Sequence, residues 1–331
     1  MKTIQGTDIS LFLKTEHTTE NMIKYFTGID ADTGLLILFK NKKPRLFLSS
    51  LEEIPNRKDI IIKHLDFKKI EKLLAKENPK IIGTHDLKLT KRGLDLFRKI
   101  TPKKTRFKDI TKDLEQIRSI KSPEEIKTLK KGIKITEEII SHLIKKIPKM
   151  TYEHEAVQFL KMECLKQNVK TSFEPLIATG TNAANPHYFT KPGTKLKNGF
   201  CIIDFGIIYN GLCSDITRTI YLGTPSKKEI DFYNKIKDSQ IKLELTTKPG
   251  EKMNFPFKMI HALGHGIGIE VHEPPMLPFE KVEVGNCIAI EPGIYTKQMS
   301  VRVEDDFLMT SQGLERLTKS SRELTIVKFN K

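Results

Sequence analysis

Apolar residues in the first third of the chain follow two alternating spacings, which predicts strands interleaved with helices. Short apolar runs bounded by turn residues predict strands at residues 35–39, 45–48, 60–65 and 80–83. Apolar positions at helical spacing predict helices at residues 67–77 and 90–100. The first two strands flank a turn-prone sequence at residues 41–44 and should form a hairpin. The pattern therefore predicts a small α/β unit that ends near residue 112.

A helix start follows this unit. Ser122 is a capping residue, Pro123 suits the first helical position, and Glu125 follows the serine by three residues. Apolar spacing predicts helices from that cap towards residue 147 and at residues 152–167. Beyond residue 172 the pattern predicts strands, at residues 173–178, 200–209, 212–222, 286–290 and 301–310. A chain of 331 residues is too long for one ordinary core, so we expect two domains, residues 1–114 and 115–331.

The charge of the chain is strongly basic but evenly spread. Lysine and arginine outnumber aspartate and glutamate by 57 to 41, a formal net charge of +16 that raises a nucleic-acid hypothesis. The lysines are scattered without a long basic arm, which favours a solvated surface and no specific nucleic-acid partner. Four cysteines without C-x-x-C spacing indicate neither a zinc knuckle nor a disulfide framework. No apolar run approaches the roughly 18 residues of a membrane span, so we expect a cytoplasmic protein without a membrane partner.

Two aspartates flank the strongest turn signal in the chain. If Asn210 and Gly211 form a two-residue hairpin loop, Asp204 and Asp215 become diagonal neighbours on one face of the sheet, about 7–8 Å apart at the backbone. Gly206 would remove a side chain that obstructs them. Two buried carboxylates this close repel each other unless a cation lies between them. The pair alone fits equally well on an exposed, solvent-facing hairpin.

A glycine-rich histidine cluster lies further along the chain. His261, His265 and His272 fall within twelve residues and are interspersed with glycines at positions 264, 266 and 268. Glycine allows the backbone and the imidazoles to approach a crowded centre closely. A lone histidine here would more often be a core residue, whereas a cluster of this kind favours a functional site.

Two glutamates complete a candidate ligand set. Glu291 ends an apolar strand. Glu304 and Arg302 take one face of another predicted strand, and two valines take the opposite face. A solvated edge strand would explain either acid alone. Together, four carboxylates and one imidazole suit two hard or borderline divalent ions such as Mn²⁺, Co²⁺ or Zn²⁺. A pair of such ions lowers the pKa of a shared water and makes it a nucleophile, which indicates hydrolysis.

These residues resemble, in order and spacing, the pita-bread metallopeptidase family of methionine aminopeptidase, prolidase, proline-directed aminopeptidase and creatinase. The resemblance rests on D-F-G…S-D-I-T-R-T, H-A-L-G-H-G-I-G-I-E-V-H-E, I-E-P-G-I-Y and V-R-V-E-D-D. It covers roughly residues 117–327, and the preceding α/β unit resembles the amino-terminal domain of the proline-specific branch. The resemblance implies an α+β pita-bread catalytic domain behind a smaller, creatinase-like α/β domain.

The resemblance also implies a role for each candidate residue. Asp204 would bind one ion, His265 and Glu291 the other, and Asp215 and Glu304 would bridge both. A bridging hydroxide would attack the scissile carbonyl, with Glu304 as a candidate proton shuttle. The substrate would be hydrogen-bonded by His187 and His272, and the end of the pocket that receives proline would be shaped by His261 and Arg302. The implied cofactors are two divalent ions, Mn²⁺ or Co²⁺, with Zn²⁺ as the alternative.

The activity implied is an exopeptidase that releases an amino-terminal residue preceding proline, as an aminopeptidase or a dipeptidase. All five ligand types are kept, which disfavours the metal-free creatinase branch, and residues 1–112 disfavour a methionine aminopeptidase. The alternatives are methionine aminopeptidase-like activity and a catalytically weakened peptide- or protein-binding homologue. We expect peptides with proline at the second position as substrates and a homodimer as the assembly.

One segment departs from the family pattern. Only ten residues separate Gly250 from His261, where the proline-specific relatives place a full amphipathic helix. We expect this loss to expose part of the sheet that the helix would cover. A partner subunit would then be one way to cover that surface.

Overall fold

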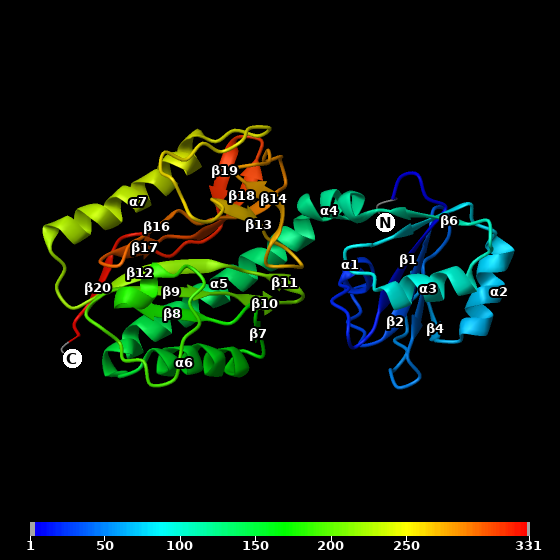
Figure 1. The fold of residues 1–331 in the computed structure, drawn as a ribbon, viewed down its shortest axis with the longest axis horizontal. Coiled ribbons are helices and arrows are strands. Elements are labelled where there is room, and N and C mark those ends of the chain that lie inside the picture. Colours follow the sequence, from blue (N-terminus) through cyan, green and yellow to red (C-terminus); the bar gives the residue numbers. More distant parts are fainter. Residues whose placement is uncertain (1–3, 330–331) are drawn as a thin grey trace. The chain divides into compact units, whose positions relative to one another are not determined.

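The structure, a computed structural model, describes residues 4–329. The chain divides into two compact units, Met1–Ile117 and Arg118–Lys331 (Figure 1). Within the described residues, no helix combines the length and the apolarity that a membrane span requires.

The first unit contains a six-stranded mixed sheet in the order β4-β3-β2-β1-β5-β6. Its strands are β1 (Ile9–Lys14), β2 (Gly34–Phe39), β3 (Arg45–Leu48), β4 (Ile61–His64), β5 (Ile81–Thr84) and β6 (Arg106–Asp109). Its helices are α1 (Met22–Thr27), α2 (Phe67–Glu77), α3 (Lys91–Ile100) and α4 (Thr111–Ser119), the last of which crosses the boundary after Ile117. The predicted hairpin is β2–β3, and α2 and α3 are confirmed with side-chain caps at Asp66 and Thr90.

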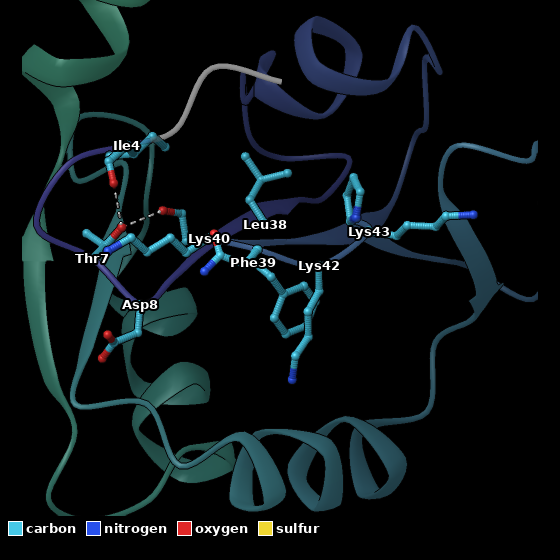
Figure 2. A pocket seen from close by; sticks show the side chains of 11 residues that line it. Ile4, Thr7, Asp8, Leu38, Phe39, Lys40, Lys42 and Lys43 are labelled. Atoms are coloured by element: carbon cyan, nitrogen blue, oxygen red, sulfur yellow. Dashed lines mark hydrogen bonds between the residues drawn. The ribbon is translucent and has the colours of Figure 1, made fainter.

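A cavity of about 270 Å³ lies in the first unit, lined mainly by Thr7, Asp8, Ser10 and residues 38–44 (Figure 2). Several of its polar groups have partners within the unit. Asp8 accepts two backbone hydrogen bonds at the start of β5, and Lys42 pairs with Glu77. None of the residues singled out in the sequence as ligands or substrate contacts lines this cavity.

The second unit begins with helices that match the predicted caps. Ser122 and Glu125 form the expected capping box. The helical elements are α5 (Pro123–Lys146), η1 (Ile147–Lys149), α6 (Glu153–Lys166), η2 (Gly180–Ala184) and α7 (Lys227–Thr246). The helix α7 was not predicted, because the sequence pattern indicated only strands beyond residue 172. It has twenty residues and opens with its own capping box at Ser226 and Glu229.

Within the described residues, the strands of the second unit form four sheets. Their orders are β20-β12-β9-β8, β14-β13-β15-β18-β19, β11-β10-β7 and β16-β17. The strands up to β12 are β7 (Lys170–Thr171), β8 (Leu176–Thr179), β9 (Gly199–Phe205), β10 (Ile207–Tyr209), β11 (Leu212–Cys213) and β12 (Ile216–Leu222). The later strands are β13 (Gly264–Gly266), β14 (Glu273–Leu277), β15 (Cys287–Ile290), β16 (Gly293–Tyr295), β17 (Ser300–Arg302), β18 (Asp305–Thr310), β19 (Gly313–Arg316) and β20 (Thr325–Val327).

Helices cover the outer faces of the two large sheets of this unit. Apolar side chains of α5 and α6 form one core with β9 and β12, including Leu143, Leu160 and Ile203. Leu243 of α7 belongs to a second core with Phe307 of β18. Residues that alternate with these core positions along the strands therefore point away from the helices, which is where the candidate ligands lie.

The expected exposure of the sheet next to the shortened segment is wrong. Residues 252–262 contain no helix or strand, yet Met253 is 3% exposed and belongs to the core of α7 and β18. Phe255 and Met259 pack against the same core, and Phe307 beneath them is fully buried. An irregular chain with three large apolar side chains therefore replaces the helical cover, and we call residues 252–262 the cover segment.

Replacing Met253 with alanine should lower the free energy of unfolding by about 2 kcal/mol, because it leaves a cavity in a closed core. The measurement is the midpoint of thermal or denaturant unfolding of the metal-free protein. Lys252→Ala, at the exposed neighbouring position, is the matched control. An equal effect of both substitutions would show that the cover segment does not seal the core.

Candidate metal centre

A β-hairpin brings the two predicted aspartate ligands together. The turn residues Asn210 and Gly211 both have positive φ angles, 47° and 87°. Asp204 on β9 pairs with Thr217 on β12, which is the register predicted from that turn. One oxygen of Asp204 and one of Asp215 lie within 4.8 Å of each other, so the two carboxylates converge as expected.

The predicted reason for Gly206 is wrong. A Cβ atom at this position would lie 1.9 Å from the backbone oxygen of Ser214 and 2.4 Å from Oγ of Ser172. The glycine therefore makes room for the neighbouring backbone between β9 and β10, and not for the two carboxylates.

Glu304 and Arg302 are buried, which excludes the solvated edge strand. They are 2% and 3% exposed. Thr217 links them, because its Oγ1 donates to Oε2 of Glu304 (2.7 Å) and accepts from Nε of Arg302 (3.0 Å). Arg302 also donates from Nη2 to Oδ2 of Asp204. This hydrogen-bond network thus joins the β9–β12 hairpin to the β17–β18 connection.

His265 and Glu291 reach the same place from neighbouring strands. His265 lies on β13, and Glu291 directly follows β15. Nε2 of His265 lies 3.7 Å from Oε1 of Glu291 and 3.8 Å from Oδ2 of Asp215. A Cβ atom at Gly264 would lie 2.0 Å from the carbonyl oxygen of Ala289, so this glycine permits the close approach of β13 and β15.

The five predicted ligands therefore share one site. Three overlapping groups have ligand atoms within 4.8 Å of one another, namely Asp204–Asp215–Glu304, His265–Glu291–Glu304 and Asp215–His265–His272. Glu304, Asp215 and His265 each belong to two groups. The side chains line a cavity of about 610 Å³.

The site concentrates negative charge in a buried place. Burial, together with the neighbouring carboxylates, raises the pKa of Asp215 and of Glu304 well above its usual value. Burial raises the pKa of Glu291 to about 7 and lowers the pKa of His265 to about 3, so the imidazole is neutral at pH 7. Neutral imidazole and converging carboxylates are the forms that ligate divalent cations.

The donor set fits divalent ions. Within the described residues, Oδ1 of Asp204 and Oδ1 of Asp215 are buried without a hydrogen-bond partner. Buried polar atoms left unpaired are costly, and a cation between these oxygens would satisfy both. Oxygen ligands with a single imidazole suit hard or borderline cations.

The predicted substrate contacts line the same cavity. His187, His261, His272 and Arg302 all contribute to its wall. The rings of His265 and His272 have centroids 4.2 Å apart. His187 comes from the loop after η2, which a residue pattern without a family resemblance would not single out.

Tyr295 belongs to the site but was not predicted from the sequence. Its hydroxyl lies 2.8 Å from Nε2 of His261 and accepts a hydrogen bond from Nη1 of Arg302 (3.0 Å). Burial raises the pKa of this phenol. A tyrosine four residues after Glu291 carries no metal-ligand signal, so only the three-dimensional contact reveals its place.

Comparisons with known proteins agree with this geometry. Residues 127–311 match the sequence profile of metallopeptidase family M24. The chain belongs to family M24. It is 30% identical to the Xaa-Pro dipeptidase of Pyrococcus furiosus over 91% of this chain and 92% of the relative. An uncharacterized peptidase of Staphylococcus epidermidis is also 30% identical, over 91% and 93%.

Solved structures confirm the predicted α+β pita-bread fold class. The prolidase of Pyrococcus horikoshii OT3 has a TM-score of 0.82 and 29% identity, covering 96% of this chain and 95% of its own. The X-Pro aminopeptidase of Thermotoga maritima has a TM-score of 0.89 at 23% identity, covering 97% and 98%. Membership of family M24 makes the chain a metallopeptidase and implies divalent ions at the cluster of carboxylates and His265.

Proposed function

We propose that this family M24 chain hydrolyses the peptide bond between an amino-terminal residue and a following proline. The observation that carries the proposal is the convergence of all five predicted ligands in one cavity, together with four candidate substrate contacts. The relatives named Xaa-Pro dipeptidase and X-Pro aminopeptidase support the substrate class. Methionine aminopeptidase-like activity and a weakened binding homologue are the less favoured alternatives.

We infer that the site holds two divalent ions, Mn²⁺ or Co²⁺ in preference to Zn²⁺. Asp204 would hold one ion, His265 and Glu291 the other, and the two acids that belong to two groups each, Asp215 and Glu304, would be shared. Bound ions of this kind supply Lewis acidity and a water of lowered pKa, which makes a nucleophile available at neutral pH.

The chain's own residues then bind the substrate and move protons. Glu304, held by Thr217 and beside the other carboxylates, is placed to accept a proton and return it to the leaving nitrogen. His187 and His272 would donate hydrogen bonds to the substrate where negative charge develops. His261 and Arg302, joined through the hydroxyl of Tyr295, would form the wall that receives the proline ring.

We further propose that residues 115–331 are the catalytic domain and residues 1–114 a creatinase-like amino-terminal domain. The five ligands, the four substrate contacts and residues 127–311 of the family match all fall in the second unit. The homodimer and the cytoplasmic location stay predictions from the sequence.

The function is tested with Xaa-Pro dipeptides, Xaa-Pro-Yaa tripeptides and matched Xaa-Ala and Met-Ala peptides in the presence of Mn²⁺ or Co²⁺. We expect kcat/KM on Xaa-Pro substrates to exceed that on the alanine peptides by at least about tenfold. A pocket that contacts the proline ring loses those contacts when alanine takes its place. The dipeptide and tripeptide arms separate a dipeptidase from an aminopeptidase. Cleavage of Met-Ala peptides alone would overturn the proline specificity, and a metal-loaded protein that cleaves nothing would favour the binding homologue.

A further inference from the structure

A buried ion-pair cluster lies behind one wall of the candidate site. Nζ of Lys121 contacts Oε1 of Glu273, and Arg118 lies 3.7 Å from Oε2 of Glu273 and 3.3 Å from Oε2 of Glu270. The side chains of Lys121 and Glu273 are 1% exposed, and that of Arg118 is 5% exposed. Two cations and two carboxylates balance each other. We call these four residues the loop clamp.

Hydrogen bonds fix the backbone segment that carries Arg118 and Lys121. The backbone N–H of Lys121 donates to the carbonyl of Gly285 (2.9 Å), and the amide of Asn286 donates to the carbonyl of Ser119 (3.0 Å). The capped start of α5 follows at once at Ser122. Residues 118–121 are therefore hydrogen-bonded to the turn that leads into β15, and they directly precede the start of a long helix.

The acidic half consists of Glu270, in the loop that carries the candidate substrate contact His272, and Glu273, at the start of β14. Glu270 and Glu273 flank Val271 and His272, and both of these residues line the cavity of the metal centre. A Cβ atom at Gly268 would lie 2.2 Å from Oε1 of Glu273, so the loop folds directly against the ion pair. Ion pairs with Arg118 and Lys121 thus hold both ends of the short stretch that contains His272.

We propose that Arg118, Lys121, Glu270 and Glu273 are positioning residues that fix His272 relative to the metal centre. The proposal rests on the proposed function, in which His272 contacts the substrate. Buried ion pairs hold their geometry because either charge left alone in the interior is strongly unfavourable. Small displacements of a catalytic contact are expensive, since rate depends on alignment within a fraction of an ångström.

The test weakens the clamp with two variants. The first removes a cation together with its carboxylate, and the second changes the more exposed carboxylate alone. Lys121→Met with Glu273→Gln removes one ion pair as a unit and leaves Arg118 with Glu270. Glu270→Gln alone changes the partner at the more exposed end, whose side chain is 21% exposed. For each variant, kcat and KM are measured on an Xaa-Pro peptide, and amide hydrogen exchange is measured across residues 267–272.

We expect kcat per folded molecule to fall about tenfold in the double variant, with KM changing less, because the interaction lost is one that strengthens in the transition state. Amide exchange in residues 267–272 should rise on the order of tenfold while the rest of the second unit keeps its protection. Lys130→Met is the matched control, because Lys130 in α5 forms an exposed pair with Glu315 of β19.

Unchanged kcat and unchanged exchange in a folded double variant would overturn the proposal, as would an equal effect of Lys130→Met. If the double variant does not fold, Glu270→Gln decides by the same two measurements. The exchange experiment needs no substrate, so a wild-type protein inactive on Xaa-Pro peptides would remove the proposed function while the exchange result still judges the clamp.

Discussion

Replacing Asp215 with asparagine is expected to lower kcat/KM on Xaa-Pro peptides by about a thousandfold or more, without loss of the fold. Asp215 lies between two groups of candidate ligands, and its Oδ1 has no hydrogen-bond partner within the described residues. An amide cannot supply the second anionic oxygen that a shared ligand needs, so metal activation of water should fail. Activity with added Mn²⁺ and metal content by mass spectrometry provide the measurements.

The same substitution should have the opposite effect on the stability of the metal-free protein. Burial and the carboxylates of Glu304 and Asp204 raise the pKa of Asp215, so its ionised form at pH 7 is unfavourable in the fold without a cation. The metal-free Asp215→Asn protein should therefore unfold at a higher temperature than metal-free wild type, and added Mn²⁺ should stabilise wild type more. Asp231→Asn, at an exposed position of α7, is the control. Full activity in the Asp215 variant would remove the proposed mechanism.

The convergence of Asp204 and Asp215 was predictable because it depends on a local rule. An Asn-Gly turn fixes the register of β9 and β12, and that register alone places Asp204 and Asp215 on one face. The capping box at Ser122 likewise fixes the start of α5. The assignment of individual ligand roles came from the family resemblance, since spacing alone does not tell a bridging acid from a terminal one.

Other features depend on contacts between distant parts of the chain. Tyr295 enters the site through its hydroxyl, and Glu273 finds Lys121 from 152 positions away. The helix α7 was missed although Ser226 and Glu229 form a capping box, because its buried face includes polar side chains such as Gln240. The packing of the cover segment could not be predicted from local pattern either, because its apolar side chains cover the core without helical spacing.

Glu291→Gln should change how the stability of the metal-free protein depends on pH. Burial raises the pKa of Glu291 in the fold from 4.5 to about 7. The folded state therefore binds the proton more tightly than the unfolded state, and the stability this contributes is present below pH 4.5 and lost as pH rises to about 7. Relative to wild type, the variant should gain on the order of 3 kcal/mol between pH 4 and pH 8.

The comparison with wild type isolates this group from His265, whose lowered pKa acts in the opposite direction as pH falls below 6.5. Denaturant unfolding of both proteins at several pH values in the presence of a chelator gives the difference directly. Glu283→Gln, an exposed acid before β15, should show no such pH-dependent gain. Added Mn²⁺ at pH 8 should reverse the order, because a ligand at about 1,000 times its Kd contributes about 4.1 kcal/mol and this ion needs the ionised carboxylate. A pH-independent difference between the two proteins would show that burial does not shift the pKa of Glu291. A difference that added metal leaves unchanged would show that Glu291 is not a ligand.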